Sequence, residues 1–263
     1  MEGTLDLNTI LLVFPEQIVE NTVYLSSKFV RAFNAKLIIL VLEKKESIDE
    51  TNLKENLNQL NINYQIHIEK NGIKEKINDY IEKFSPDMIV LPHEKIDPMV
   101  HIFKHPITEK FVERFDKTHV IFPLKETKDI QKSLIYIDPN NDTEAYIKSA
   151  FEILSRVSLA EFIYSFHEEY FEYSLMKTHP EAEAKSIIKQ LYEEGIEKSK
   201  QLIAKAIGKE ITLKVIKGDP KKEVPFFAMT NGYDLLGINI NHEDKKSFIE
   251  NTEISIGLFK GEG

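Results

Sequence analysis

The chain has 263 residues, no cysteine and a formal net charge of −9. The length suits two domains of about 130 residues each. Without cysteine there are no disulfides, thiolate metal sites or cysteine nucleophiles, and the composition fits a reducing interior. Acidic and basic residues are interspersed, which argues against nucleic acid as a partner, because phosphate binding needs clustered Lys and Arg. No apolar run reaches the roughly eighteen residues of a membrane span, so we expect a cytoplasmic protein without membrane insertion.

Short apolar runs alternate with helical patterns along the first half, which predicts βαβ units and a parallel sheet. The runs are continuous rather than alternating, as expected when helices cover both faces of a sheet. The predicted strands are Thr9–Phe14, Lys36–Leu42, Tyr64–Ile68, Met88–Leu91 and His119–Leu124. The predicted helices are Glu16–Phe33, Ser47–Leu60 with a capping box from Ser47 to Glu50, Ile73–Phe84 and Thr108–Phe115.

A polar stretch of mixed charge, Lys125–Lys132, separates the two halves, and we place domain 1 at residues 1–128 and domain 2 at residues 129–263. The pattern then starts again. The predicted strands are Ser133–Ile137, Glu161–Phe166, Ile211–Lys217, Leu235–Ile240 and Ser255–Phe259. The predicted helices are Asp142–Val157, Glu181–Ile207 and Pro220–Thr230. The same order of elements at a spacing of about 130 residues indicates a duplicated domain rather than a solenoid.

Several short motifs recur in a fixed order. The third strand of the second half leaves through Val215-Ile216-Lys217-Gly218-Asp219-Pro220, and the fourth strands begin with Asp87-Met88-Ile89-Val90 and Asp234-Leu235-Leu236. Thr108-Glu109-Lys110-Phe111-Val112 then precedes the strand His119-Val120-Ile121-Phe122. In this order the chain resembles a tandem universal stress protein over roughly residues 7–260.

That resemblance implies an α/β fold of two doubly wound, five-stranded parallel sheets, of the adenine nucleotide alpha hydrolase-like type. It also implies that the fifth strands, His119–Leu124 and Ser255–Phe259, pair across a pseudo-two-fold axis, giving an intramolecular pseudo-dimer. A further homodimer of chains stays open.

Nucleotide-binding members of that family carry Gly-x-x-Gly-x9-Gly-Ser after strand four, where glycine lets backbone N–H groups approach the phosphates. Counting from Asp87, the motif positions hold Pro92, Lys95, His105 and Pro106. Proline offers no N–H, and a side chain blocks close approach of the backbone. The count from Asp234 gives Asn239 and His242 in a shortened loop. We therefore expect the ATP phosphate loop to be lost.

One feature of the family survives in the second half. Asp138 follows strand Ser133–Ile137 where the family places the Asp that contacts base and ribose, whereas the first half has Phe14-Pro15 there. The tentative nucleotide-binding residues are Asp138, Asn140, Gly218 and Asn239. The competing interpretation is that the segment 138–142 is only a turn and a helix cap.

Two other groups of residues suggest chemistry. His93, His101 and His105 lie near one another in sequence, but two His at i, i+4 fall short of a metal site, and no metal is expected. The aromatic stretch Phe162–Tyr173 favours core packing, with a lid or a partner surface as the alternative. No Gly-x-Ser-x-Gly, Gly-x-Gly-x-x-Gly or P-loop motif is present, so we expect no enzyme.

The leading hypothesis is a non-catalytic stress-response or regulatory protein that binds an unidentified protein or small molecule and uses no cofactor. The alternative is an AMP- or ATP-binding stress protein that uses the second half around Asp138.

Overall fold

The computed structural model describes residues 5–15, 18–43, 50–70, 76–93, 118–209 and 211–261. The chain divides into two compact units, residues 1–130 and 131–263, two residues beyond the boundary expected from the charge pattern. None of the helices in these ranges is long and apolar enough to cross a membrane.

The first unit is built on a parallel sheet with the strand order β3-β2-β1-β4-β5. Its strands are β1 (Thr9–Phe14), β2 (Lys36–Glu43), β3 (Tyr64–Lys70), β4 (Met88–Val90) and β5 (His119–Phe122). Its described helices are α1 (Glu20–Phe33), α2 (Glu50–Gln59) and α3 (Lys76–Phe84). The central strands are almost fully buried, which explains why they read as continuous apolar runs.

The second unit repeats this order as β8-β7-β6-β9-β10, again with every neighbouring pair parallel. Its strands are β6 (Lys132–Tyr136), β7 (Leu159–Phe166), β8 (Leu213–Lys217), β9 (Leu235–Asn239) and β10 (Ser255–Phe259). Its helices are α5 (Glu144–Ser155), α6 (Glu168–Leu175), α7 (Glu181–Ile207), α8 (Pro220–Thr230) and α9 (Lys245–Asn251).

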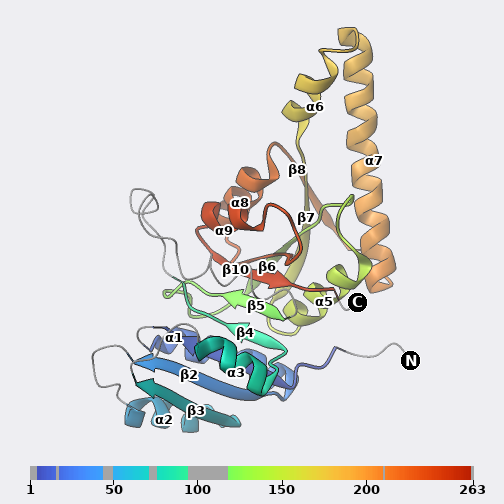
Figure 1. Cartoon of the computed structure of the whole chain (residues 1–263). Coiled ribbons are helices and arrows are strands. Elements are labelled where there is room, and N and C mark those ends of the chain that lie inside the picture. Colours follow the sequence, from blue (N-terminus) through green and yellow to red (C-terminus); the bar gives the residue numbers. More distant parts are fainter. Residues whose placement is uncertain are drawn as a thin grey trace. The chain divides into compact units, whose positions relative to one another are not determined.

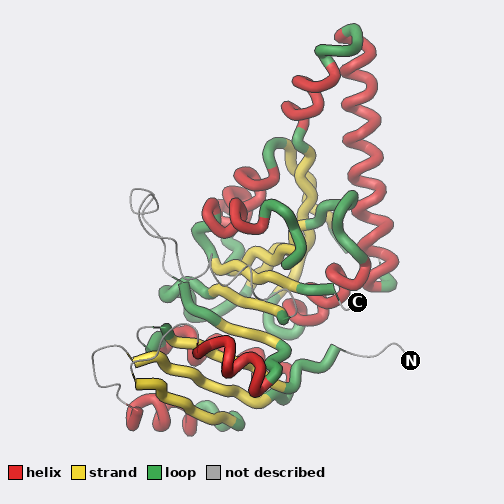
Figure 2. The backbone as a smooth tube through the Cα atoms, in the orientation of Figure 1, coloured by secondary structure: helices red, strands yellow, loops and turns green. Residues whose placement is uncertain are grey.

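Helices cover both faces of each sheet, so the expected doubly wound α/β class is confirmed. In the first unit α3 lies in front of the strands and α1 behind them (Figure 1). In the second unit α5 packs against α7 and α8 packs against α9, and each pair covers its own face (Figures 1 and 2). The apolar face of each helix is thereby removed from water, which is the main source of stability in such layered folds.

An aspartate clamps the start of the fourth strand to the start of the first strand in the same way in both units. Oδ2 of Asp87 accepts the backbone N–H groups of Asn8 (2.8 Å) and Thr9 (3.0 Å). Oδ2 of Asp234 accepts those of Gln131 (2.8 Å) and Lys132 (3.0 Å). The two aspartates that open the Asp-apolar-apolar motifs therefore fix the register at the amino edge of each sheet.

Several elements differ from the sequence-based expectation, mostly by a few residues at one end; α1, for example, begins at Glu20 rather than at Glu16. No helix was predicted where α6 and α9 lie. The helix expected from Asp142 begins instead at Glu144, because the hydroxyl of Thr143 accepts the N–H of Tyr146 (3.2 Å) and caps it. The predicted helix 108–115 and the cap at residue 47 lie outside the described residues.

Candidate functional site

The carboxyl ends of β6 and β9 meet at one edge of the second sheet, the edge at which open α/β sheets bind ligands. There the structure brings Asp138 and Asn239 together through a third residue, Asp142. One carboxylate oxygen of Asp142 accepts the backbone N–H of Asp138 (2.7 Å), and the other accepts the side-chain amide of Asn239 (2.8 Å). Asp142 is therefore the centre of this group.

The carboxylate of Asp138 is engaged within its own turn. Its Oδ1 accepts the backbone N–H of Asn140 (3.0 Å), and its Oδ2 accepts the side-chain amide of Asn141 (2.7 Å). The first of these bonds is the one that defines an Asx-turn. The geometry is that of the turn weighed against the nucleotide site, while the helix cap is Thr143. A nucleotide-binding role for Asp138 and Asn140 stays a prediction.

His242 fills the space beside this turn. Its side chain is only 5% exposed and lies edge-on to the rings of Tyr136 and Phe248, with centroids 5.7 and 5.3 Å away. Nδ1 accepts the backbone N–H of Asp244 (3.0 Å), so in the neutral imidazole the proton resides on Nε2, which lies 3.9 Å from Oδ2 of Asp138. Burial lowers the pKa of His242 and outweighs the opposing effect of the nearby carboxylates.

Burial acts in the opposite direction on Asp142. It raises the pKa of this carboxyl group to about 7, although the hydrogen bonds from Asp138 and Asn239 favour the charged form. The carboxyl edge therefore holds one group that changes charge near neutrality and a neutral imidazole close by, with no lysine or arginine ion-paired to Asp142 among the described residues.

The turn after β9 uses its backbone N–H groups internally. The N–H of His242 donates to the carbonyl of Asn239 (3.0 Å), and that of Asn241 donates to the side-chain oxygen of Asn239 (2.9 Å). The N–H of Asp244 bonds to the His242 ring, and that of Lys245 to the His242 carbonyl (3.2 Å). A phosphate cradle needs such N–H groups to be free, and these four are already engaged.

Gly218 does not join this group. It follows β8, which β7 separates from β6. Its backbone is tied to the end of β7, since its N–H donates to the carbonyl of Phe166 (2.9 Å) and its carbonyl accepts the hydroxyl of Ser165 (2.9 Å). Its φ of +118° explains the glycine. Of the four predicted site residues, Asp138, Asn140 and Asn239 lie together and Gly218 lies apart.

Sequence reasoning missed Asp142 and His242 as members of the site. Counting the glycine-motif positions from Asp234 did place His242 at a position where the family has glycine. The position of His242 two residues before Asp244 was a further sequence signal, whereas its aromatic neighbours Tyr136 and Phe248 meet it only in the folded chain. Asp142 was predicted only as the last residue of the turn 138–142 and the first of the following helix, because its burial arises from tertiary packing.

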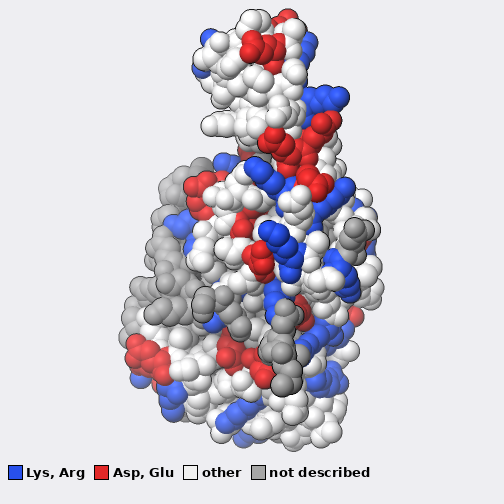
Figure 3. Space-filling view, turned by 90° about the vertical axis from the view of Figure 1, so that its right-hand side faces the viewer, with Lys and Arg blue, Asp and Glu red and all other residues white. Residues whose placement is uncertain are grey.

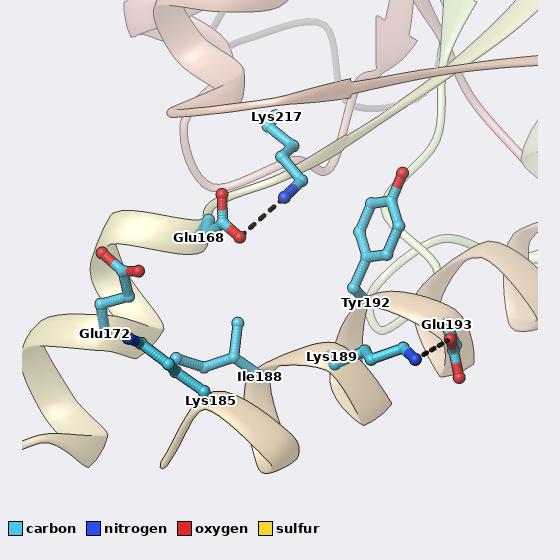
Figure 4. A pocket seen from close by; sticks show the side chains of 8 residues that line it. All are labelled: Glu168, Glu172, Lys185, Ile188, Lys189, Tyr192, Glu193 and Lys217. Carbon is cyan, nitrogen blue, oxygen red and sulfur yellow. Dashed lines mark hydrogen bonds and ion pairs between the residues drawn. The ribbon is translucent and has the colours of Figure 1, made fainter. Parts of the chain in front are cut away.

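Apart from the carboxyl edge, a hollow lies between α6, α7 and β8. It has a volume of about 450 Å³ (Figure 4). Its lining residues are Glu168, Glu172, Lys185, Ile188, Lys189, Tyr192, Glu193 and Lys217. Lys217 donates to Glu168 (2.7 Å), and Lys189 lies 3.8 Å from Glu193. Three carboxylates face three ammonium groups, so the hollow has no net charge with which to attract an anion or a cation.

Metal binding gains no support in the described part of the chain, where His, Asp, Glu and Cys form no group of three that could hold a metal ion. Of the three histidines weighed for a metal, His93 is described and lies at a bridge beside β5; His101 and His105 lie outside the described residues, as do Lys95 and Pro106. Pro92 is buried after β4.

Comparison with solved structures identifies the fold. The chain superposes on a putative universal stress protein from Pseudomonas aeruginosa UCBPP-PA14 with a TM-score of 0.71 and 14% identity, over 97% of this chain and 94% of the other. The chain has the universal stress protein fold. A universal stress protein from Archaeoglobus fulgidus DSM 4304 gives a TM-score of 0.62 at 10% identity, over 97% and 96% of the two chains.

A functionally unknown protein from Pseudomonas aeruginosa PAO1 gives a TM-score of 0.70 at 14% identity, over 97% of this chain and 93% of the other. No protein-family model matches the sequence, and no curated protein matches it. The likeness to universal stress proteins therefore lies in the fold, at identities where sequence comparison finds nothing.

Proposed function

We propose that this chain is a non-catalytic, universal-stress-protein-like binding protein with a regulatory role in a stress response, in which the nucleotide site of the second unit is closed. The observation that carries the proposal is the turn after β9. Its N–H groups at Asn241, His242, Asp244 and Lys245 are all donated within the chain. A phosphate in the position implied by the family resemblance would have to break these bonds.

The side chains at the same edge support the proposal. The ring of His242 packs against the rings of both Tyr136 and Phe248, and the carboxylate of Asp138 is held by its own turn. In the first unit, Pro92 stands at the first glycine position and has no N–H to offer. A tandem architecture with a lost phosphate loop accounts for both units together.

The alternative is an AMP- or ATP-binding protein that uses Asp138. One observation favours it, namely that the Asp138 side chain keeps 19% exposure at the carboxyl edge. Adenine and ribose could meet this carboxylate without a phosphate cradle if the side-chain amide of Asn141 moved aside.

Thermal unfolding with and without ATP, ADP, AMP and adenosine at millimolar concentration tests both hypotheses. A ligand that binds the folded state raises its stability by mass action, by about 2.7 kcal/mol at a hundredfold excess over the dissociation constant. We expect no change in the unfolding temperature and no release of phosphate from ATP.

Two variants make the outcome specific to the site. If the wild type is stabilised by a nucleotide and Asp138→Ala abolishes the effect, the alternative is correct and the proposed closure is wrong. Lys198→Ala on the exposed side of α7 serves as the control, because it should leave any nucleotide effect unchanged. Phosphate release that depends on a named residue would contradict the non-catalytic role.

A further inference from the structure

α6 is fastened to the second unit by one side only. Phe171 and Leu175 point inward and pack on a cluster formed by Tyr164, Phe166 and Ile188. The rings of Phe166 and Phe171 stack with centroids 5.1 Å apart and an interplanar angle of 10°. This packing fixes the rotation of the helix about its own axis and so decides which residues face outward.

The outward side of α6 carries large side chains in water. Tyr170 is 59% exposed, Tyr173 is 69% exposed, and Met176, at the end of the helix, is 46% exposed. Glu169 and Lys177 flank them and are also exposed. Relative to Tyr173 these residues stand at −4, −3, +3 and +4, the spacing that places side chains on one face of a helix. α6 itself ends at Leu175, and the turn that continues from it carries Met176 and Lys177. We call this set the α6 stripe.

The α6 stripe is arranged symmetrically about Tyr173, with an acid at one end and a base at the other. If a second α6 lay antiparallel against it with Tyr173 at the centre, position −4 would face +4 and position −3 would face +3. Glu169 would then meet Lys177 of the other copy twice, and Tyr170 would meet Met176 twice. Sulfur–aromatic contacts are favourable, and so are opposite charges at such spacing.

We propose that the α6 stripe is an isologous contact surface whose partner is a second copy of this chain, with the two α6 helices antiparallel across a two-fold axis. Isologous contact requires a self-complementary surface, and the Glu–Tyr–Tyr–Met–Lys order supplies one. A purely basic or purely acidic peptide would be repelled at one end of the stripe. At the α6–α7 end of the second unit, charged side chains of both signs lie among uncharged ones (Figure 3), so this end offers no field of one sign to a charged partner.

The contact is weak and depends on concentration. The three large side chains expose roughly 350 Å² per copy, given the size of aromatic side chains. The surface that two copies would bury together is about half the area of a standard stable interface, which is about 1,200–2,000 Å². The dimer should therefore form at high protein concentration and dissociate on dilution.

Sedimentation equilibrium of the full chain at low ionic strength, from micromolar to millimolar concentration, tests the geometry by charge exchange. Glu169→Lys and Lys177→Glu should each raise the dissociation constant about tenfold, because two attractive pairs become repulsive. The double variant should return to the wild-type value. An equimolar mixture of the two single variants should form a heterodimer as tight as the wild-type dimer.

The rescue separates this proposal from damage to the helix. Loss of helix stability would add up in the double variant, whereas complementary charges restore association. Lys198→Glu, on α7, changes the net charge by the same amount as Lys177→Glu and should leave the dissociation constant unchanged. Tyr173→Ala should raise the dissociation constant. Three outcomes would each overturn the proposal. The wild type could stay monomeric at millimolar concentration, the charge exchanges could leave the dissociation constant unchanged, or the two single variants could fail to associate when mixed.

Discussion

Replacing Asp234 with alanine should destabilise the second unit by about 2–3 kcal/mol. The carboxylate accepts two backbone N–H groups, from Gln131 at 2.8 Å and Lys132 at 3.0 Å. Hydrogen bonds to charged groups contribute about 1.5–3 kcal/mol each. The bond from Gln131 is exposed, so water replaces part of it and the combined loss is smaller than twice that value.

Urea denaturation gives the loss of unfolding free energy, and hydrogen exchange locates it. Faster exchange is expected at the amides of β6 and β9 in Asp234→Ala. The matched variant Asp87→Ala removes the equivalent pair of bonds from Asn8 and Thr9 and should cost about the same, with faster exchange at β1 and β4. Asp234→Asn, which keeps one acceptor oxygen, should recover at least half of the loss. A cost below about 0.5 kcal/mol for both alanine variants, the size of an ordinary surface substitution, would refute the reasoning.

Three further predictions concern the second unit. Burial raises the pKa of Asp142 to about 7 from 3.8, so the folded chain keeps a proton that the unfolded chain releases. The stability contributed by Asp142 should then fall as the pH rises from about 4 to about 7. Urea denaturation over this range should show that the unfolding free energy of the wild type falls relative to that of Asp142→Asn. Tyr146→Phe removes a fully buried hydroxyl that donates to the Tyr136 carbonyl (2.9 Å), and calorimetry should show a loss of about 1–3 kcal/mol. Gly195→Ala should destabilise the fold by about 1–3 kcal/mol, although alanine has the better helix propensity, because the new Cβ would lie 2.2 Å from the Tyr164 hydroxyl. Adding Tyr164→Phe should recover part of this loss of unfolding free energy. If nothing is recovered, the proposed clash is wrong.

Hydrophobic patterning determined where most strands and helices lie, while the arrangement in doubly wound, five-stranded sheets followed from the family resemblance. The strands Thr9–Phe14 and Ser255–Phe259 and the helices Glu181–Ile207 and Pro220–Thr230 have the predicted bounds, because buried parallel strands must be apolar throughout and covering helices must be apolar on one side. The repeated order of these elements was visible for the same reason. The family resemblance supplied Asp138, Asn140, Gly218 and Asn239 as site residues. Three of them lie together because the carboxyl ends of neighbouring parallel strands meet at one edge, whereas Gly218 follows β8 and lies apart.

Tertiary structure decided what that edge contains. Burial of Asp142 and His242 depends on how α9 and the turn after β9 pack on β6, and short range sequence patterns carry no information about that packing. α6 was missed because its inward residues, Phe171 and Leu175, become apolar contacts only when α7 lies beside them. The exposed α6 stripe is a consequence of the same contact, since the side of a short helix that faces water is fixed by what its other side touches.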